Sequence, residues 1–108
     1  MRALALALLA TPALAEPSLP TIRLATCAAL WEGYADVLGD DGERALAARF
    51  EAAAVRLGGE EARALVAERR PWMRDLLHAY TEHQDDQSRE LFERLVTDCG
   101  TLAADLPP

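Results

Sequence analysis

Two cysteines are the residues of this sequence with the clearest chemistry. Cys27 and Cys99 lie far apart, and the sequence has no third cysteine to compete with them. Thiols in an oxidising compartment form disulfides, whereas the C-x-x-C spacing of thiol-exchange catalysts is absent. The pair therefore predicts one structural disulfide, which closes a loop of about 73 residues. Redox sensing and pairing between two molecules are the alternatives.

A second candidate site is the one locally basic segment of an otherwise acidic sequence. Its members that could bind a partner are Arg69, Arg70, Trp72 and Arg74. Guanidinium groups hold carboxylates in a planar fork, and Arg and Trp are frequent hot spots of protein interfaces. The segment is thus a candidate docking patch for an anionic group of a partner. The alternative is a core tryptophan flanked by solvated arginines that pair with Glu68 and Asp75.

Metal and cofactor chemistry finds weaker support. Asp75, His78 and Glu82 are spaced by three and four residues, so they share one face of a helix. That face is either solvated or a weak Zn²⁺ or Cu²⁺ site. Haem attachment would need C-x-x-C-H, which is absent, and Met73 shares a predicted helix with both histidines. No G-x-S-x-G or H-E-x-x-H motif occurs, so we expect neither a cofactor nor an enzyme.

The beginning of the sequence has the pattern of an export signal. Arg2 is followed by the apolar run Ala3–Ala10, and Ala13-Leu14-Ala15 fits a small-x-small cleavage site. The run is too short to span a bilayer. We therefore expect residues 1–15 to be a cleaved signal peptide and the periplasm to be the destination, with no membrane anchor left after cleavage. Residues 16–20 read as a linker and 21–108 as a single domain.

The charge of the chain limits its partners. All eleven basic residues are arginine. Loss of Arg2 leaves 10 basic against 18 acidic residues, a net charge of −8. Nucleic-acid binding needs clustered Lys and Arg to displace counterions from phosphate, so we expect no nucleic acid among the partners.

Apolar residues recur at spacings of three and four in four stretches, which predicts four helices. The first runs from about Thr21 to Leu38 and stops at Gly39; the second opens with Asp40 and ends at Gly58-Gly59. The third begins at Glu60 and contains Pro71, where we expect a kink or short break. The fourth runs from about Asp86 to Leu106. No alternating β-pattern appears.

Four helices with short connections favour an all-α, up-down-up-down bundle. In that arrangement the first and last helices are antiparallel neighbours. Cys27 lies roughly 9 Å above the start of the first helix and Cys99 roughly 10 Å before the end of the fourth, at 1.5 Å per residue. The two cysteines are therefore expected at the same height in the bundle. The up-down arrangement and a Cys27–Cys99 disulfide are thus consistent with each other.

Three functions remain as hypotheses. The first is a non-catalytic interaction or accessory module that binds another envelope protein. The second is an envelope-stress chaperone that loosens in acid, since an exported helical domain with a single disulfide is similar in general plan to the HdeA-like acid-stress chaperones. The third is a weak metal carrier or small enzyme.

Overall fold

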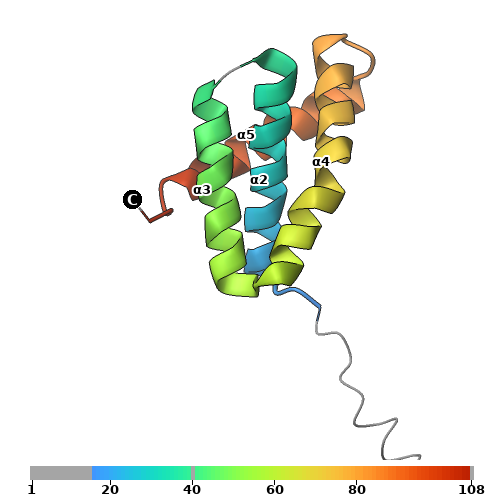
Figure 1. Ribbon diagram of the computed structural model, residues 1–108. Helices are drawn as coiled ribbons and strands as arrows, with labels where there is room; N and C mark the ends of the chain where they lie inside the picture. Colours follow the sequence, from blue (N-terminus) through green and yellow to red (C-terminus); the bar gives the residue numbers. More distant parts are fainter. Residues whose placement is uncertain (1–15, 40, 108) are drawn as a thin grey trace, which may run out of the picture.

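The described part of the chain is built from four helices. The computed structural model describes residues 16–39 and 41–107, and the predicted signal peptide lies outside them. In order, the helices are α2 (Leu19–Leu38), α3 (Asp41–Gly58), α4 (Glu60–Thr81) and α5 (Asp86–Ala103), with no strand in these ranges (Figure 1). The predicted all-α class and the four helical segments are confirmed.

Local capping explains where α2 begins and ends. Ser18 accepts a hydrogen bond from the backbone N–H of Thr21 at 3.3 Å, as an N-cap serine does. The helix therefore starts at Leu19, inside the stretch predicted as a linker. At the other end Gly39 takes φ +72°, and its N–H donates to the carbonyl of Ala35 at 2.7 Å. This left-handed cap suits glycine and ends the helix at the predicted position.

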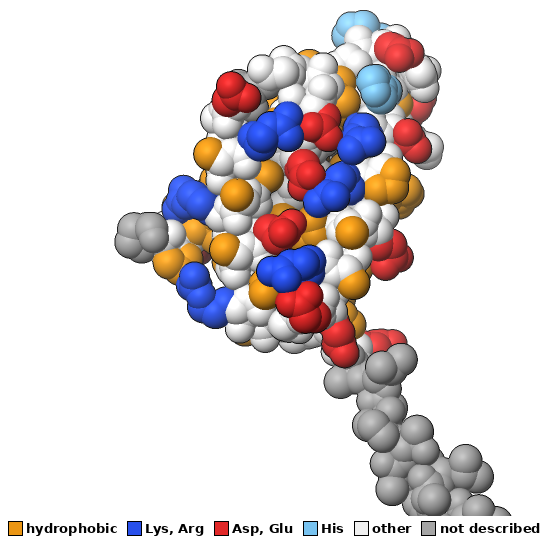
Figure 2. Space-filling model, in the orientation of Figure 1, with side chains coloured by type: hydrophobic (Ala, Val, Ile, Leu, Met, Phe, Trp, Pro, Cys, Tyr) orange, Lys and Arg blue, Asp and Glu red, His pale blue; other side chains and the backbone are white. Residues whose placement is uncertain are grey.

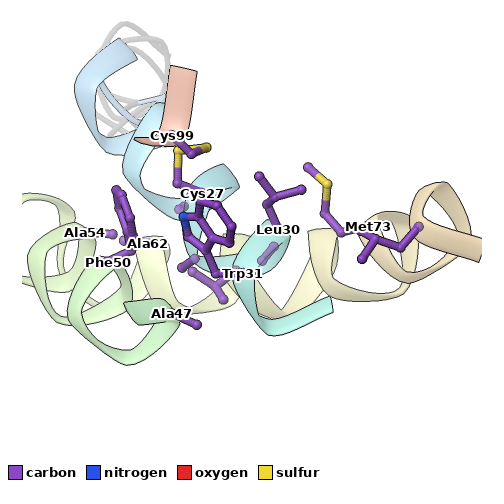
Figure 3. Packing of buried hydrophobic residues seen from close by; sticks show 14 of the residues in the cluster. Cys27, Leu30, Trp31, Ala47, Phe50, Ala54, Ala62, Met73 and Cys99 are labelled. Carbon is purple, nitrogen blue, oxygen red and sulfur yellow. A yellow bond between two sulfur atoms is a disulfide. The ribbon is translucent and has the colours of Figure 1, made fainter. Parts of the chain in front are cut away.

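Helix α2 is the central element of the core. The sequence predicts a single apolar stripe on it, but its buried residues lie all around its circumference: Thr21, Ala25, Cys27, Ala28, Ala29, Leu30, Trp31, Gly33 and Ala35. A helix that is apolar on every side is one that other elements surround. Helices α3 and α4 cover most of it, and Figure 3 shows Phe50 of α3 and Met73 of α4 in the same cluster as Leu30 and Trp31.

Small residues let the helices approach α2 closely. A Cβ added at Gly33 would lie 3.4 Å from the backbone of Met73 and Arg74 in α4. A Cβ at Gly58, where α3 ends, would lie 2.5 Å from Cγ2 of Thr21. Gly58 therefore stands where the neighbouring helix leaves room only for a hydrogen, whereas Gly33 marks a close but ordinary contact between α2 and α4.

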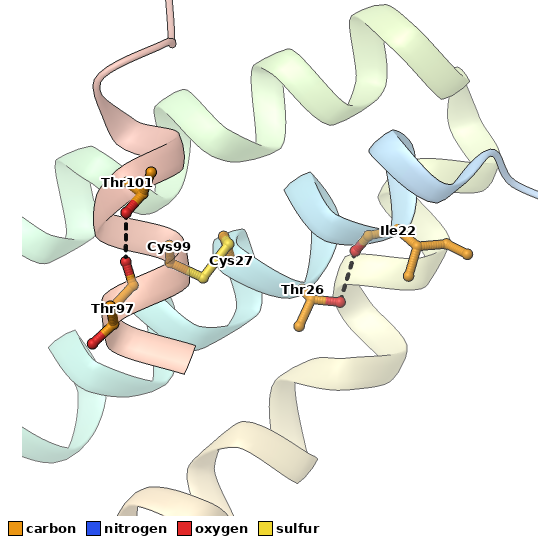
Figure 4. Close-up of a disulfide and its surroundings, with 6 residues drawn as sticks. All are labelled: Ile22, Thr26, Cys27, Thr97, Cys99 and Thr101. Carbon is orange, nitrogen blue, oxygen red and sulfur yellow. Dashed lines mark hydrogen bonds between the residues drawn. A yellow bond between two sulfur atoms is a disulfide. The ribbon is translucent and has the colours of Figure 1, made fainter. Parts of the chain in front are cut away.

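Helix α5 is attached differently from the other three. Only Phe92 and Cys99 of α5 are buried, and the helix crosses behind the others in Figure 1. Cys99 forms the predicted disulfide with Cys27, with a Cα–Cα distance of 5.5 Å (Figure 4). The bond joins the first and last described helices, as expected. The up-down arrangement is not confirmed, because α5 crosses α2 instead of running along it.

Helix α4 runs through Pro71 as one unbroken segment from Glu60 to Thr81. No break occurs there, and a kink at this proline stays a prediction. Pro71 is exposed, so its ring points away from the core and the missing N–H faces solvent.

Candidate functional site

The predicted docking patch divides between two faces of α4. Successive helical residues are about 100° apart, so neighbours such as Arg69 and Arg70 cannot face the same way. Arg70 and Arg74 lie on the side next to α2 and α3, where both form ion pairs. Arg69 lines a separate hollow with Trp72. The four residues are therefore not one patch, and each pair has its own surroundings.

Arg70 and Arg74 belong to a cross-helix ion-pair cluster on the face formed by α2, α3 and α4. We use this name for seven residues: Glu32, Asp36, Arg44, Glu51, Arg63, Arg70 and Arg74. Figure 2 shows acidic and basic side chains alternating across this face. Charges of opposite sign are thus interleaved, and the face carries no block of a single sign.

The shortest contacts of the cluster connect α4 and α3 to α2. Arg70 Nε lies 2.7 Å from Glu32 Oε1. Asp36 receives two arginines, with Arg44 Nη2 at 3.0 Å and Arg74 Nη2 at 3.2 Å. These partners lie on other helices, whereas the sequence had suggested pairs within α4.

Glu51 of α3 forms the longer contacts of the cluster. Its carboxylate is 3.9 Å from Arg70 and 4.0 Å from Arg63. Exposed ion pairs contribute about 0–1 kcal/mol each, so the cluster sets the register of three helices more than it sets their stability. Its arginines are already engaged with carboxylates of the same chain.

Trp72, unlike the paired arginines, stands out into solvent: 61% of its surface is exposed. The expectation of a core tryptophan at this position is wrong; Met73, one residue on, occupies the core with no exposure at all. Trp72, Glu68 and Arg69 line a hollow of about 220 Å³. Tryptophan side chains are largely buried in most proteins, so an indole this exposed is unusual.

An apolar groove continues from Trp72 toward α5. It has a volume of about 280 Å³ and is lined by Trp72, Asp75, Leu76, Ala79, Ser88 and Leu91. Leu91 on α5 is itself 36% exposed. Sequence reasoning did not single out Leu91, whose neighbour Phe92 is buried. Two adjacent apolar residues on a helix are the signal that could have revealed it, since only one of them can face the core.

The candidate metal-binding face at the end of α4 gathers no ligand set. Asp75, His78 and Glu82 are all exposed. Over residues 16–39 and 41–107, no group of three or more His, Cys, Asp or Glu side chains is arranged to hold a metal ion. The polar surface there resembles an ordinary solvated helix face.

Among the described residues, no helix combines the length and the apolar character needed to cross a membrane. Comparison of the chain with protein-family models, with curated proteins and with solved structures finds no match in any of the three. The features of the molecule that bear on function are therefore its own residues, above all the exposed Trp72 and the groove beside it.

Proposed function

We propose that the protein is a non-catalytic interaction module of the bacterial envelope, and that it binds a protein partner through the Trp72 side of α4. The observation that carries this proposal is the 61% exposure of Trp72 next to an apolar groove. Exposed apolar surface rimmed by polar residues is typical of interaction sites. Glu68, Arg69 and Asp75 supply such a rim.

The rigidity of the scaffold supports the same proposal. Trp72 directly precedes Met73 on α4, and Met73 is fully buried beside Gly33 of α2. Anchors held on a well-packed helix lose little conformational entropy when a partner binds. A kink at Pro71, which precedes Trp72 directly, would set how far the indole stands out from the bundle.

Export to the periplasm fits this role and belongs to the proposal. A disulfide such as Cys27–Cys99 persists in oxidising compartments and is rare in reducing ones. Because residues 1–15 have the pattern of a signal peptide, we also propose that the chain is cleaved after Ala15. The acidic composition supports a protein partner in preference to nucleic acid.

Site-specific photo-crosslinking tests the docking surface. A photoreactive phenylalanine analogue replaces Trp72 in one variant and Ala52 in the control; Ala52 is exposed on α3 and lines none of these hollows. Irradiation of intact cells is expected to give a defined protein adduct at position 72 and none at position 52. No adduct at 72, or equal adducts at both positions, would refute the proposal.

Arg70 and Arg74 are unsuitable for this test, although they belonged to the predicted patch. Reversing their charge would break ion pairs with Glu32 and Asp36 inside the bundle. A loss of binding would then reflect displaced helices. Arg69 is the arginine whose substitution reports on docking, because it lines the hollow beside Trp72 and forms no ion pair with the described residues.

An acid-stress chaperone is a second candidate, favoured by the cross-helix ion-pair cluster. Carboxylic acids become neutral in strong acid, and protonation of Glu32, Asp36 and Glu51 would leave four arginines on one face without counter-charges. Repulsion between the arginines of α3 and α4 would push these two helices apart, and α4 would also lose its ion pairs to α2. The apolar core between these helices would then become available to unfolded clients.

Light scattering of an aggregating client at about pH 2–3 tests this second function. The chaperone proposal expects suppression in acid and none at neutral pH. A Glu32→Gln/Glu51→Gln variant should begin to suppress aggregation at a higher pH, because part of the cluster is already neutral. Aggregation that proceeds unchanged in acid would end the proposal.

A further inference from the structure

We propose that the occupant of the Trp72 surface is a basic amphipathic helix of another protein, which lies along the groove between α4 and α5. This inference rests on the proposed function, since it names the chemistry of the partner at the same site. Two stripes on the outer side of α4 carry it, one apolar and one acidic.

The apolar stripe consists of Leu65, Trp72 and Ala79, which follow one another at intervals of seven residues. Seven residues make almost two turns of an α-helix, so the three side chains lie in one row. Trp72 is exposed and the other two are half-buried, so the rest of the molecule covers this row only in part. Leu76 and Leu91 widen the row into the groove of about 280 Å³. An apolar row with this repeat is the pattern by which one helix packs lengthwise against another.

The acidic stripe runs beside the apolar one and consists of Glu61, Glu68 and Asp75, again at intervals of seven residues. All three are exposed, and none forms an ion pair within residues 16–39 and 41–107. The carboxylates of the cross-helix ion-pair cluster, by contrast, all have arginine partners. Charges that flank an apolar row determine which helix pairs with it. A complementary helix therefore carries Arg or Lys on the matching flank, at the same interval of about 10.5 Å.

The surroundings of Trp72 favour the same partner. Along α4 the indole lies between Glu68 and Asp75, at spacings of four and three residues that place all three on one side of the helix. A cationic side chain is attracted to the face of an indole, so one basic residue of the partner can contact both the ring and a carboxylate. Arg69 is about 100° from Glu68 and lies on the other flank of Trp72. Opposite charges on the two flanks also define the direction in which the partner lies.

Isothermal titration calorimetry with two synthetic helical peptides tests the chemistry of the partner. Both peptides have 22 residues, the length of α4, and the same row of leucines. One carries arginine beside that row at every seventh residue, and the other carries glutamate there. The disulfide-bonded protein, purified after export of the full chain, is expected to bind the arginine peptide with a Kd of about 10–100 µM. The glutamate peptide should bind at least about tenfold more weakly, because it faces the acidic stripe.

Three variants show whether the Trp72 surface is responsible. Glu68→Arg/Asp75→Arg should reverse the preference, so that the glutamate peptide binds more tightly, and Trp72→Ala should weaken the arginine peptide by at least about tenfold. Glu93→Arg/Asp105→Arg makes the same change in net charge at exposed positions that line neither hollow, and it should keep the wild-type preference. Near-UV circular dichroism shows whether each variant retains the bundle. The comparison of two peptides on the wild type needs no variant at all.

Equal binding of the two peptides by the wild type, or no binding of the arginine peptide at about 500 µM, would overturn the inference. A control variant that reverses the preference as Glu68→Arg/Asp75→Arg does would also overturn it, because net charge alone would then explain the binding. Crosslinking at position 72 separates this failure from failure of the proposed function. An adduct with a second copy of this chain, or with a protein segment that is not a basic helix, overturns the inference and leaves the docking surface standing.

Discussion

Reduction of the Cys27–Cys99 disulfide should detach α5 from a core that otherwise persists. Of the α5 side chains only Phe92 and Cys99 are buried. Phe92 stacks between aromatic rings, with centroid distances of 4.1 Å to Tyr80 and 6.2 Å to Tyr34. The disulfide is the second attachment, and without it α5 is held by one aromatic cluster and partly buried leucines. Its helix should therefore open before the others.

The size of the effect follows from the loop that the disulfide closes. The two cysteines are 72 residues apart. In the chain-entropy model a loop of that length stabilises the folded state by about 4.4 kcal/mol. A domain of this size has a total free energy of unfolding of about 5–15 kcal/mol. The bond therefore accounts for a large share of the stability.

Urea unfolding followed by circular dichroism measures this share. We expect the midpoint to fall by about 2–4 M urea on reduction. Reduced wild-type protein is the primary comparison because it keeps every sulfur atom. The variant Cys27→Ala/Cys99→Ala, which also removes two buried side chains, should be at least as destabilised.

Hydrogen exchange shows which helices lose stability when the disulfide is reduced. Amides of α5 should lose protection in the reduced protein while those of α2 keep theirs, because α2 is enclosed by α3 and α4. A reduced protein with the oxidised midpoint would refute the entropic argument. Equal loss of protection in α2 and α5 would refute the view that α5 is attached separately.

Three further substitutions test the packing and capping of the helices, each by thermal unfolding. Gly58→Ala should lower stability by about 1–2 kcal/mol, because its Cβ would meet Cγ2 of Thr21 at 2.5 Å; a variant as stable as wild type would show that the helices part easily there. Gly100→Ala is the matched control and should raise stability by about 0.5–1 kcal/mol, since an added Cβ meets nothing within 4 Å. Asp85→Ala should cost about 1 kcal/mol, because Asp85 accepts a hydrogen bond from the N–H of Ser88 at 2.6 Å and caps α5; no loss would mean that water replaces the cap.

The helices and the disulfide could be predicted because local chemistry determines them. Gly39 and Gly59 adopt positive φ at helix boundaries, which is a property of glycine that the sequence reveals directly. The two cysteines had only each other as partners. Neither prediction required knowledge of how one helix crosses another.

The arrangement of the helices could not be predicted from the same patterns. Spacings of three and four residues show which side chains share a face, but they do not give the angle at which α5 crosses α2. The sequence does contain a sign that α2 is central, but it does not show when only residues spaced by three and four are compared. Ala28, Ala29, Leu30 and Trp31 are four apolar residues in a row, and such a run points to every side of a helix.

The candidate site shows the same limit at the scale of single residues. Trp72 and Met73 are adjacent apolar residues about 100° apart on α4, so one of them must leave the core. Met73 is the one that packs in the core, with its backbone next to Gly33 of α2. Once Met73 is fixed there, Arg70 and Arg74 fall beside the carboxylates of α2, and Arg69 falls on the side of Trp72. A basic segment that reads as one patch in the sequence thus divides between arginines that pair with carboxylates of α2 and the exposed Trp72 side, on which the proposed docking surface lies.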